Sequence, residues 1–388
     1  MANVEKLLHG SSEGVDLLTK LDLLPPETRL LKTAKAKVRE HLRIAISEGT
    51  KERLGVTIAP RFFTQGSDTY KTLNRPAWMP PQQMDLDDGV YLPMMFVKGA
   101  TPSQASPFFF AIVDTALKAL VKREGWQAFD DSKDTCARVV INDTAHVDVP
   151  LYAIPDDEFG KLTKAAMKAM VAADGADFDF MRSRIDRLDS WDALPSDKVL
   201  LAHRKDDWKP SDPRKMHEWF LASIEDFGER LRRECRYLKA WRDHHKLGHI
   251  SSIILMVYAW TVFEEIGQLH VPARDDLMLL KIAERLPDLF SREIENPTNP
   301  EELLGLGWSH EERRTAIQAA SMMREDLDMA INHCWQPEVA VSRIRSVFGS
   351  RIPNRPDLIS VKAVAAATVA ATPVVYSPAP EVGRSTSG

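Results

Sequence analysis

Residues 84–91 have the sequence MDLDDGVY, in which two aspartates stand two positions apart. Side chains two apart on a β-strand point to the same face, so the carboxylates of Asp85 and Asp87 would converge on one spot. Carboxylates forced together repel, and a divalent cation that binds both relieves the repulsion. The alternative is an acidic hairpin turn at Asp88–Gly89. The apolar residues on either side favour a partly buried strand.

A second segment, residues 62–72, has the sequence FFTQGSDTYKT. An apolar, strand-like run ends here in Gly66–Ser67, and residues compatible with a turn or a helix follow. Backbone N–H groups and a hydroxyl at such a junction can hold phosphate oxygens. An ordinary turn after a strand is the alternative that this segment alone leaves open.

A third segment, residues 142–152, has the sequence NDTAHVDVPLY. On a strand, His146 and Asp148 share one face, and Pro150 marks an edge or a strand end. Asp148 would then complete a three-carboxylate metal site with the two aspartates of residues 84–91. Taken alone, Asp148 is more often a hydrogen-bonded aspartate at a strand end, and His146 is more often a core histidine with satisfied hydrogen bonds.

The order of the three segments is more specific than any one of them. A Gly-Ser loop, an Asp-x-Asp about twenty residues later and a single Asp on a further strand form a layout that resembles the DNA polymerase β-like nucleotidyltransferases. Nucleotidyl transfer develops charge on the attacking, leaving and equatorial oxygens. Two Mg²⁺ ions about 4 Å apart, held by carboxylates, stabilise that charge.

The predicted secondary structure changes along the chain. A helical pattern begins at Pro25 and is predicted to stop at Gly49; short β-prone runs and one apolar helix follow to about residue 155, and helical patterns then dominate. The predicted fold class is α+β: a DNA polymerase β-like core with a small mixed sheet and a long N-terminal bracing helix, followed by an α-helical domain. The predicted boundaries are an N-terminal segment at 1–24, the core at 25–200, the helical domain at 201–352 and a disordered tail at 353–388.

Composition limits the partners. The 388 residues contain 51 Lys and Arg against 56 Asp and Glu, a net charge of −5, whereas a protein that coats duplex nucleic acid needs a basic face. The three cysteines, about a hundred residues apart, form neither a disulfide framework nor a local zinc clip. No leader pattern opens the chain and no window reaches 18 apolar residues. We therefore expect a cytoplasmic protein with no DNA and no membrane partner.

In the helical half, residues 228–246 predict one helix with a basic stripe. Its members recur three or four positions apart: Arg232, Arg236, Lys239, Arg242 and Lys246. A solvated face is one interpretation, and the other places Lys239 on the β- and γ-phosphates of a nucleotide. Ser251–Ser252 opens the next apolar helix, where its hydroxyls suit a helix cap and a phosphate ligand equally well.

Four segments carry a resemblance to a known family: 65–72, 80–93, 133–152 and 233–241. Their sequences resemble the cGAS/DncV-like nucleotidyltransferases of bacterial anti-phage signalling (CBASS), and most of all the bacterial cyclic GMP–AMP synthase type. The likeness covers about residues 25–350. It implies a two-lobed enzyme whose active site lies in the cleft between the lobes.

This resemblance implies roles residue by residue. Asp85, Asp87 and Asp148 would be catalytic and would bind two Mg²⁺ ions, for which Mn²⁺ could substitute. The family joins two NTPs, here expected to be ATP and GTP, through a linear dinucleotide into a 3′,5′-linked ring. Asn296 stands where relatives are expected to carry aspartate. The base or structural contact that this aspartate would make is therefore not carried over to this chain. The residues implied in nucleotide binding are Gln65, Gly66, Ser67, Tyr70, Arg138, Ser211, Asp212, Lys239 and Ser252.

The resemblance also implies partners. The cyclic dinucleotide would activate a downstream effector, and an E1/E2-like conjugating partner would act on Gly388. The Cys/His zinc insert of the animal DNA sensor is absent from the sequence, so DNA activation is not expected. Two alternatives stay open: a linear oligonucleotide or RNA-end nucleotidyltransferase that uses the same carboxylates, and a non-catalytic nucleotide-binding module.

Overall fold

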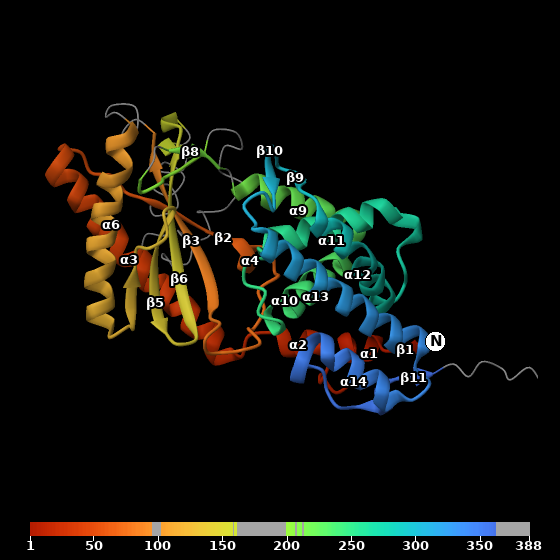
Figure 1. The fold of residues 1–388 in the computed structure, drawn as a ribbon. Helices are drawn as coiled ribbons and strands as arrows, with labels where there is room; N and C mark the ends of the chain where they lie inside the picture. Colours follow the sequence, from red (N-terminus) through yellow and green to blue (C-terminus); the bar gives the residue numbers. More distant parts are fainter. Residues whose placement is uncertain (95–101, 158, 161–198, 206–207, 212, 362–388) are drawn as a thin grey trace, which may run out of the picture.

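The structure is a computed structural model that describes residues 1–94, 102–157, 159–160, 199–205, 208–211 and 213–361. It has two lobes, one built on a mixed β-sheet and one built from helices (Figure 1). The strands of the first lobe are β2 (Arg61–Gln65), β3 (Met84–Pro93), β4 (Ala128–Asp130), β5 (Cys136–Asn142), β6 (Ala145–Ile154), β7 (Leu200–Leu201) and β8 (Lys209–Pro210).

The sheet has the order β2-β3-β6-β5-β4, with β7 beside β6 and β8 beside β7. β3 and β6 are parallel, and the other neighbouring strands are antiparallel. Two long helices, α3 (Pro25–Leu54) and α6 (Pro102–Glu124), pack side by side on one face of the sheet (Figure 1). The predicted α+β class, with its mixed sheet and long bracing helix, is confirmed.

The bracing helix α3 is longer than predicted, because Gly49 does not stop it. The helix continues to Leu54 and ends at Gly55, whose φ of 69° is the left-handed conformation that favours glycine. A Cβ on Gly49 would lie 3.2 Å from the side chain of Ile112 in α6. Gly49 therefore allows the two helices to approach closely, which outweighs its low helix propensity.

A buried ion pair ties α3 to the sheet. Arg39 donates from Nε to Asp88 Oδ2 at 2.6 Å and from Nη2 to Oδ1 at 2.5 Å, and Asp88 is fully buried. Because neighbouring strand residues alternate between faces, Asp87 must point the other way, toward the face that α3 and α6 leave uncovered. The alternative of a hairpin turn at Asp88–Gly89 is wrong, since β3 runs through both residues.

The helical lobe contains both described ends of the chain and a small hairpin (Figure 1). None of the described helices combines the length and apolar character needed to cross a bilayer. Its longer elements are α9 (Pro213–Phe227), α10 (Glu229–His244), α11 (Ser252–Ile266), α12 (Asp275–Ser291), β9 (Ile294–Asn296), β10 (Asn299–Leu304), α13 (His310–Asp328) and α14 (Pro337–Phe348). Shorter helical segments are α1 (Glu5–Leu8), α2 (Leu17–Leu21), Gln268–His270, Met329–His333, Gly349–Arg351 and Pro356–Leu358.

The structure moves two of the predicted boundaries. β1 (Ala2–Asn3) pairs with β11 (Ser360–Val361), so the chain is structured for several residues past 353, where the tail was predicted to begin. β7 and β8 belong to the sheet, which therefore extends beyond residue 200. Residues 362–388, the rest of the predicted tail, lie outside the described residues.

Glu234 on α10 is expected to destabilise the helical lobe at neutral pH. Its carboxylate is fully buried with no hydrogen-bond partner among the described residues, and burial, then the charge of Asp275, raises its pKa well above the usual value. The folded protein therefore keeps a proton that the unfolded chain releases above about pH 4.3, so stability falls as the pH rises from there. Glu234→Gln is expected to raise the free energy of unfolding at pH 8 by at least about 1.4 kcal/mol.

Urea denaturation of both proteins at pH 5 and pH 8 measures this difference. Glu225→Gln, an exposed glutamate on α9, is the control and should change neither value. The prediction would be contradicted if the difference in the free energy of unfolding between Glu234→Gln and the wild type does not increase from pH 5 to pH 8.

Candidate active site

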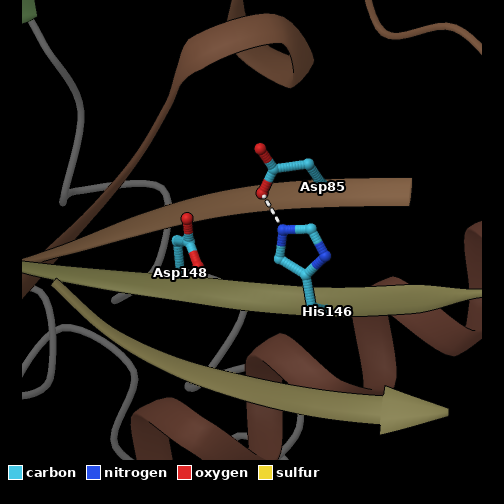
Figure 2. Close-up of side chains that lie close together, drawn as sticks. All are labelled: Asp85, His146 and Asp148. Carbon is cyan, nitrogen blue, oxygen red and sulfur yellow. Dashed lines mark ion pairs between the residues drawn. The ribbon is translucent and has the colours of Figure 1, made fainter. Parts of the chain in front are cut away.

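The parallel pairing of β3 with β6 brings the predicted acidic residues together. In the register, Asp85 lies beside His146 and Asp87 lies beside Asp148. All four positions share the face of the sheet opposite to α3 and α6. Figure 2 shows Asp85 on β3 close to His146 and Asp148 on β6. One ligand atom from each of Asp85, His146 and Asp148 lies within 4.8 Å of the other two.

Asp148 is buried and held by two cations. Arg138 on β5 donates from Nε to Oδ1 at 2.6 Å and from Nη2 to Oδ2 at 2.8 Å, and Lys133 Nζ donates to Oδ2 at 2.8 Å. Burial alone would raise the pKa of Asp148, but the hydrogen bonds from Arg138 and Lys133 hold that pKa below its usual value. The Asp148 carboxylate is therefore ionised at neutral pH.

Asp87 experiences the opposite effect. Burial, and then the charges of Asp85 and Asp148, raise the pKa of Asp87 well above its usual value. Asp85 Oδ1 is buried and has no hydrogen-bond partner among the described residues. Clustered carboxylates are a donor set that Mg²⁺ or Mn²⁺ accepts. The residues present therefore fit a divalent cation at this face.

The predicted phosphate turn lies directly against this cluster. β2 ends at Gln65, and the short helix α4 (Gly66–Thr69) follows, with Gly66 at a φ of 66°. A Cβ on Gly66 would lie 2.3 Å from Asp87 Oδ2. Gln65 pairs with Asp87 in the register, and Gln65 Oε1 accepts a hydrogen bond from Tyr152 Oη at 3.0 Å. The turn thus requires glycine for two reasons, the left-handed backbone and the approach of Asp87.

A cleft of about 570 Å³ lies between the lobes, in front of the acidic cluster. Its sheet side is formed by the Gly66 turn and the aspartates of β3, and its helical side by α9, the start of α11 and the β9–β10 hairpin. Its volume is typical of small-molecule sites. The predicted residues that line it are Gln65, Gly66, Ser67, Tyr70, Asp85, Asp87, Ser211 and Ser252.

The other predicted residues lie elsewhere. Arg138 and Lys239 are not among the described residues that line the cleft: Arg138 is bound to Asp148, and Lys239 to the carbonyl oxygen of Thr72. Asp148 joins the acidic cluster from β6. Asp212 and Gly388 lie outside the described residues.

The basic stripe on α10 binds the loop that follows the Gly66 turn. Arg232 Nε donates to the carbonyl oxygen of Tyr70 at 3.0 Å, and Lys239 Nζ donates to that of Thr72 at 2.7 Å. Both cationic side chains are buried, so a solvated face is the wrong interpretation for them. Burial, and then the charge of Arg242, lowers the pKa of Lys239 to about 8. The stripe therefore fastens the helical lobe to the loop that follows the Gly66 turn of the sheet lobe.

The two serines before α11 have different partners. Ser251 Oγ caps the helix by accepting a hydrogen bond from Ile254 N at 3.2 Å. Ser252 Oγ accepts one from Arg242 Nη1 at 3.0 Å, and both serines line the cleft. The cap assignment therefore belongs to Ser251, and Ser252 is the serine that α10 holds at the cleft.

Several cleft residues were not predicted as site residues, and Asn296 was noted only as a departure from the aspartate expected in relatives. The β9–β10 hairpin contributes Asn296, Thr298, Asn299 and Glu302, and α9 contributes Lys215. Asn296 Nδ2 donates to Glu302 at 2.8 Å, and Asn296 Oδ1 accepts from the backbone N–H of Thr298 at 3.0 Å, which shapes the hairpin at the cleft. These residues lie more than sixty positions from the carboxylates in sequence, so only the packing of the lobes brings them to the site.

The acidic strand pair and the adjoining glycine-serine turn place the fold in the nucleotidyltransferase class. Residues 60–152 match the family described as "Cyclic GMP-AMP synthase DncV-like, nucleotidyltransferase domain". Residues 228–361 match the family described as "Cyclic GMP-AMP synthase, C-terminal domain".

Relatives and solved structures agree with these matches. The chain is 34% identical over 323 residues to a cyclic GMP-AMP synthase of Vibrio cholerae, covering 81% of this chain and 72% of the relative. It is 36% identical over 307 residues to one of Escherichia coli, covering 77% of this chain and 69% of the relative. A crystal structure of V. cholerae DncV with the linear intermediate 5′ pppA(3′,5′)pG superposes with a TM-score of 0.73 at 27% identity, covering 93% of this chain and 99% of that one. The chain belongs to the DncV-like cyclic GMP–AMP synthase family, and it is a nucleotidyltransferase of the cyclic dinucleotide synthase type.

Proposed function

We propose that this chain joins ATP and GTP by two successive 3′,5′ linkages, through a linear dinucleotide, into cyclic GMP–AMP. The observation that carries the proposal is the approach of Gly66 to Asp87, because it sets a phosphate-binding turn directly against the carboxylates in an open cleft. The choice of bases is supported by the similar V. cholerae structure, whose bound intermediate contains A and G.

In this proposal the sheet lobe holds the reacting phosphates. Backbone N–H groups and the hydroxyl of the Gly66–Ser67 turn donate to phosphate oxygens. Gln65 and Tyr70 flank the turn and line the cleft, and the bond from Tyr152 fixes the amide of Gln65. These contacts orient the triphosphate for in-line attack by a 3′-hydroxyl.

Asp85, Asp87 and Asp148 are proposed to hold two Mg²⁺ ions. When bound, the cations neutralise the charge that develops on the phosphoryl oxygens. Arg138 and Lys133 keep Asp148 ionised, so that its carboxylate is available as a ligand or as the acceptor of the proton that the attacking hydroxyl loses.

The helical lobe is proposed to hold the second nucleotide. Ser252 at the start of α11 and Ser211 between β8 and α9 both line the cleft, where they can contact a base or a phosphate, and Asp212 is proposed to do the same. Lys239 and Arg138 keep their proposed role as phosphate-binding cations. The position of Lys239 supports this role, since its hydrogen-bond partner Thr72 lines the cleft.

Single omission of nucleotides tests the proposed reaction. The protein is incubated with Mg²⁺ and all four NTPs or with one NTP left out, the mixture is treated with phosphatase, and the products are separated by chromatography. We expect a phosphatase-resistant product that requires ATP and GTP and no other NTP. A product that instead grows on an added RNA primer would favour an RNA-end transferase, and absence of any phosphatase-resistant product would contradict cyclisation.

Two wider roles follow from the family resemblance. We propose that the cyclic dinucleotide acts in anti-phage defence through a downstream effector, and that an E1/E2-like partner conjugates the chain through Gly388, whose unhindered carboxylate suits adenylation. The pairing of β11 with β1 holds Val361, the last described residue, against the N-terminal strand. Deleting Gly388 should remove conjugates in cells that contain the partner, and conjugates that persist would contradict this role.

A further inference from the structure

The two ring nitrogens of the histidine in the acidic cluster have different neighbours: Nδ1 faces Gln83, and Nε2 faces Asp85. His146 on β6 is 6% exposed, and its Nδ1 lies 2.9 Å from Gln83 Oε1. Gln83 Nε2 donates to the carbonyl oxygen of Asn142 at 3.1 Å, which fixes the amide with its oxygen toward the ring. Since an amide oxygen only accepts, Nδ1 carries the proton and donates it to Gln83.

The second nitrogen, Nε2, faces Asp85. Nε2 and Asp85 Oδ1 are 2.9 Å apart and form an ion pair when the ring is protonated, which the dashed line in Figure 2 marks. Both atoms are buried, and neither gains a hydrogen bond of acceptable geometry. Two polar atoms this close need a positive charge between them: a proton on Nε2, which makes the pair an ion pair, or a cation that both atoms bind.

The 2.9 Å separation suits two ligands of one metal ion. In an octahedral shell with bonds of about 2.1 Å, neighbouring ligand atoms are about 3 Å apart. The Nδ1–H bond to Gln83 is also the outer contact that orients a metal-bound histidine, because it fixes the tautomer and turns Nε2 toward the metal.

Asp148 can supply a third ligand atom on the same side. A carboxylate has about four lone-pair sites, and the hydrogen bonds from Arg138 and Lys133 occupy three of them. Oδ1 accepts only one of these three bonds, so it keeps a lone pair for a cation. One ligand atom from each of Asp85, His146 and Asp148 already lies within 4.8 Å of the other two.

We propose that His146 Nε2 is a nitrogen ligand of the divalent cation bound by Asp85 and Asp148. The proposal rests on the proposed function, in which these carboxylates hold metal ions, and it adds to the carboxylates a donor of a different kind. Imidazole nitrogen favours transition metals over Mg²⁺, whereas carboxylate oxygens suit both. One cation position should therefore select Mn²⁺ over Mg²⁺ more strongly than an all-oxygen site does.

Pulsed electron paramagnetic resonance of bound Mn²⁺ tests the proposal without any turnover. The full chain is loaded with Mn²⁺ alone, since nucleotide nitrogens would confuse the signal, and is prepared with natural and with ¹⁵N-labelled histidine. We expect a directly coordinated nitrogen in the wild-type spectrum, with the isotope change that the label produces. Mn²⁺ that shows no nitrogen coupling, shows coupling unchanged by the label, or stays unbound at millimolar concentration would overturn the proposal.

A variant series adds a second readout. His146→Asn retains a polar group near Gln83 but lacks Nε2, and it should lose the nitrogen coupling and lower the Mn²⁺-to-Mg²⁺ affinity ratio by about tenfold. His41→Asn on α3 is the matched control and should keep both. If His146→Asn loses Mn²⁺ affinity while wild-type Mn²⁺ shows no nitrogen, His146 only positions Asp85 and the proposal fails.

Failure of this proposal and failure of the proposed function give different results. Wild-type protein that makes the phosphatase-resistant dinucleotide without nitrogen coupling would leave the function standing and remove His146 as a ligand. Nitrogen coupling in a protein that makes no such product would support the ligand and contradict the function.

Discussion

Asp87→Asn is expected to lower dinucleotide formation by at least about 10³-fold and, in the same protein, to stabilise the fold. Loss of a carboxylate that holds cations on the transferring phosphoryl group removes several kcal/mol of transition-state stabilisation, which corresponds to that factor. The gain in stability arises because the variant no longer places a third negative charge beside Asp85 and Asp148. A change that only damaged the fold would lower both quantities together.

The pH dependence of the stability gain follows from the raised pKa of Asp87. In metal-free buffer the folded state holds a proton on Asp87 that the unfolded chain releases above about pH 3.9. The wild type therefore loses stability relative to Asp87→Asn as the pH rises from about 4 toward the folded pKa. Urea denaturation with a chelator at pH 4 and pH 8 measures the gap, which should be larger at pH 8.

Divalent cations should narrow this gap. A cation at a hundred times its dissociation constant stabilises the state that binds it by about 2.7 kcal/mol, and Asp87→Asn should gain less of this than the wild type. Asp131→Asn, an exposed aspartate paired with Lys118, is the control and should alter neither activity nor the response to Mg²⁺ or Mn²⁺. Equal stabilisation of wild type and Asp87→Asn by the cations would show that Asp87 is not a metal ligand.

Local patterns in the sequence predicted the parts of the site that depend on one segment. The spacing of Asp85 and Asp87 required only that residues 84–91 form a strand, and β3 satisfies that condition. The Gly66 turn was likewise visible as a glycine and a serine after an apolar run. The periodicity of side chains along a strand and the residue preferences of a turn depend on a few neighbouring residues. Both can therefore be inferred without knowledge of the tertiary fold.

Features set by packing between distant segments could not be predicted in the same way. Gly49 has the local signature of a helix stop, yet α3 continues because the glycine admits the side chain of Ile112 from α6. The stripe on α10 has the spacing of a solvated face, but Lys239 bonds the backbone of Thr72 in the other lobe. In both cases the decisive neighbour is more than sixty residues away in the sequence.

His146 shows the same limit inside the site. Its position on an apolar strand is typical of a core histidine, and the ring is in fact buried. The parallel register that sets His146 beside Asp85 joins residues 61 positions apart, and nothing in either segment specifies it. Only the register distinguishes a core histidine from one aimed at a carboxylate.

Gly66→Ala is expected to reduce dinucleotide formation by at least about 10²-fold with a modest loss of stability. The new Cβ would lie 2.3 Å from Asp87 Oδ2, so either the carboxylate or the phosphate turn must move. A displacement of about 1 Å in a catalytic group can cost 10²-fold in rate. The φ of 66° adds a backbone cost of about 1–2 kcal/mol, which affects stability and not the chemistry itself.

Gly125→Ala separates the two effects. Gly125 has a φ of 67°, almost the same as Gly66, but a Cβ there would meet no atom within 4 Å. Urea denaturation should therefore show a similar decrease in the free energy of unfolding for both variants. Only Gly66→Ala should lose activity under saturating NTP and Mg²⁺. Equal activity in the two variants would mean that the turn can recede from Asp87 without harm, and that the contact between them does not set the geometry of the reaction.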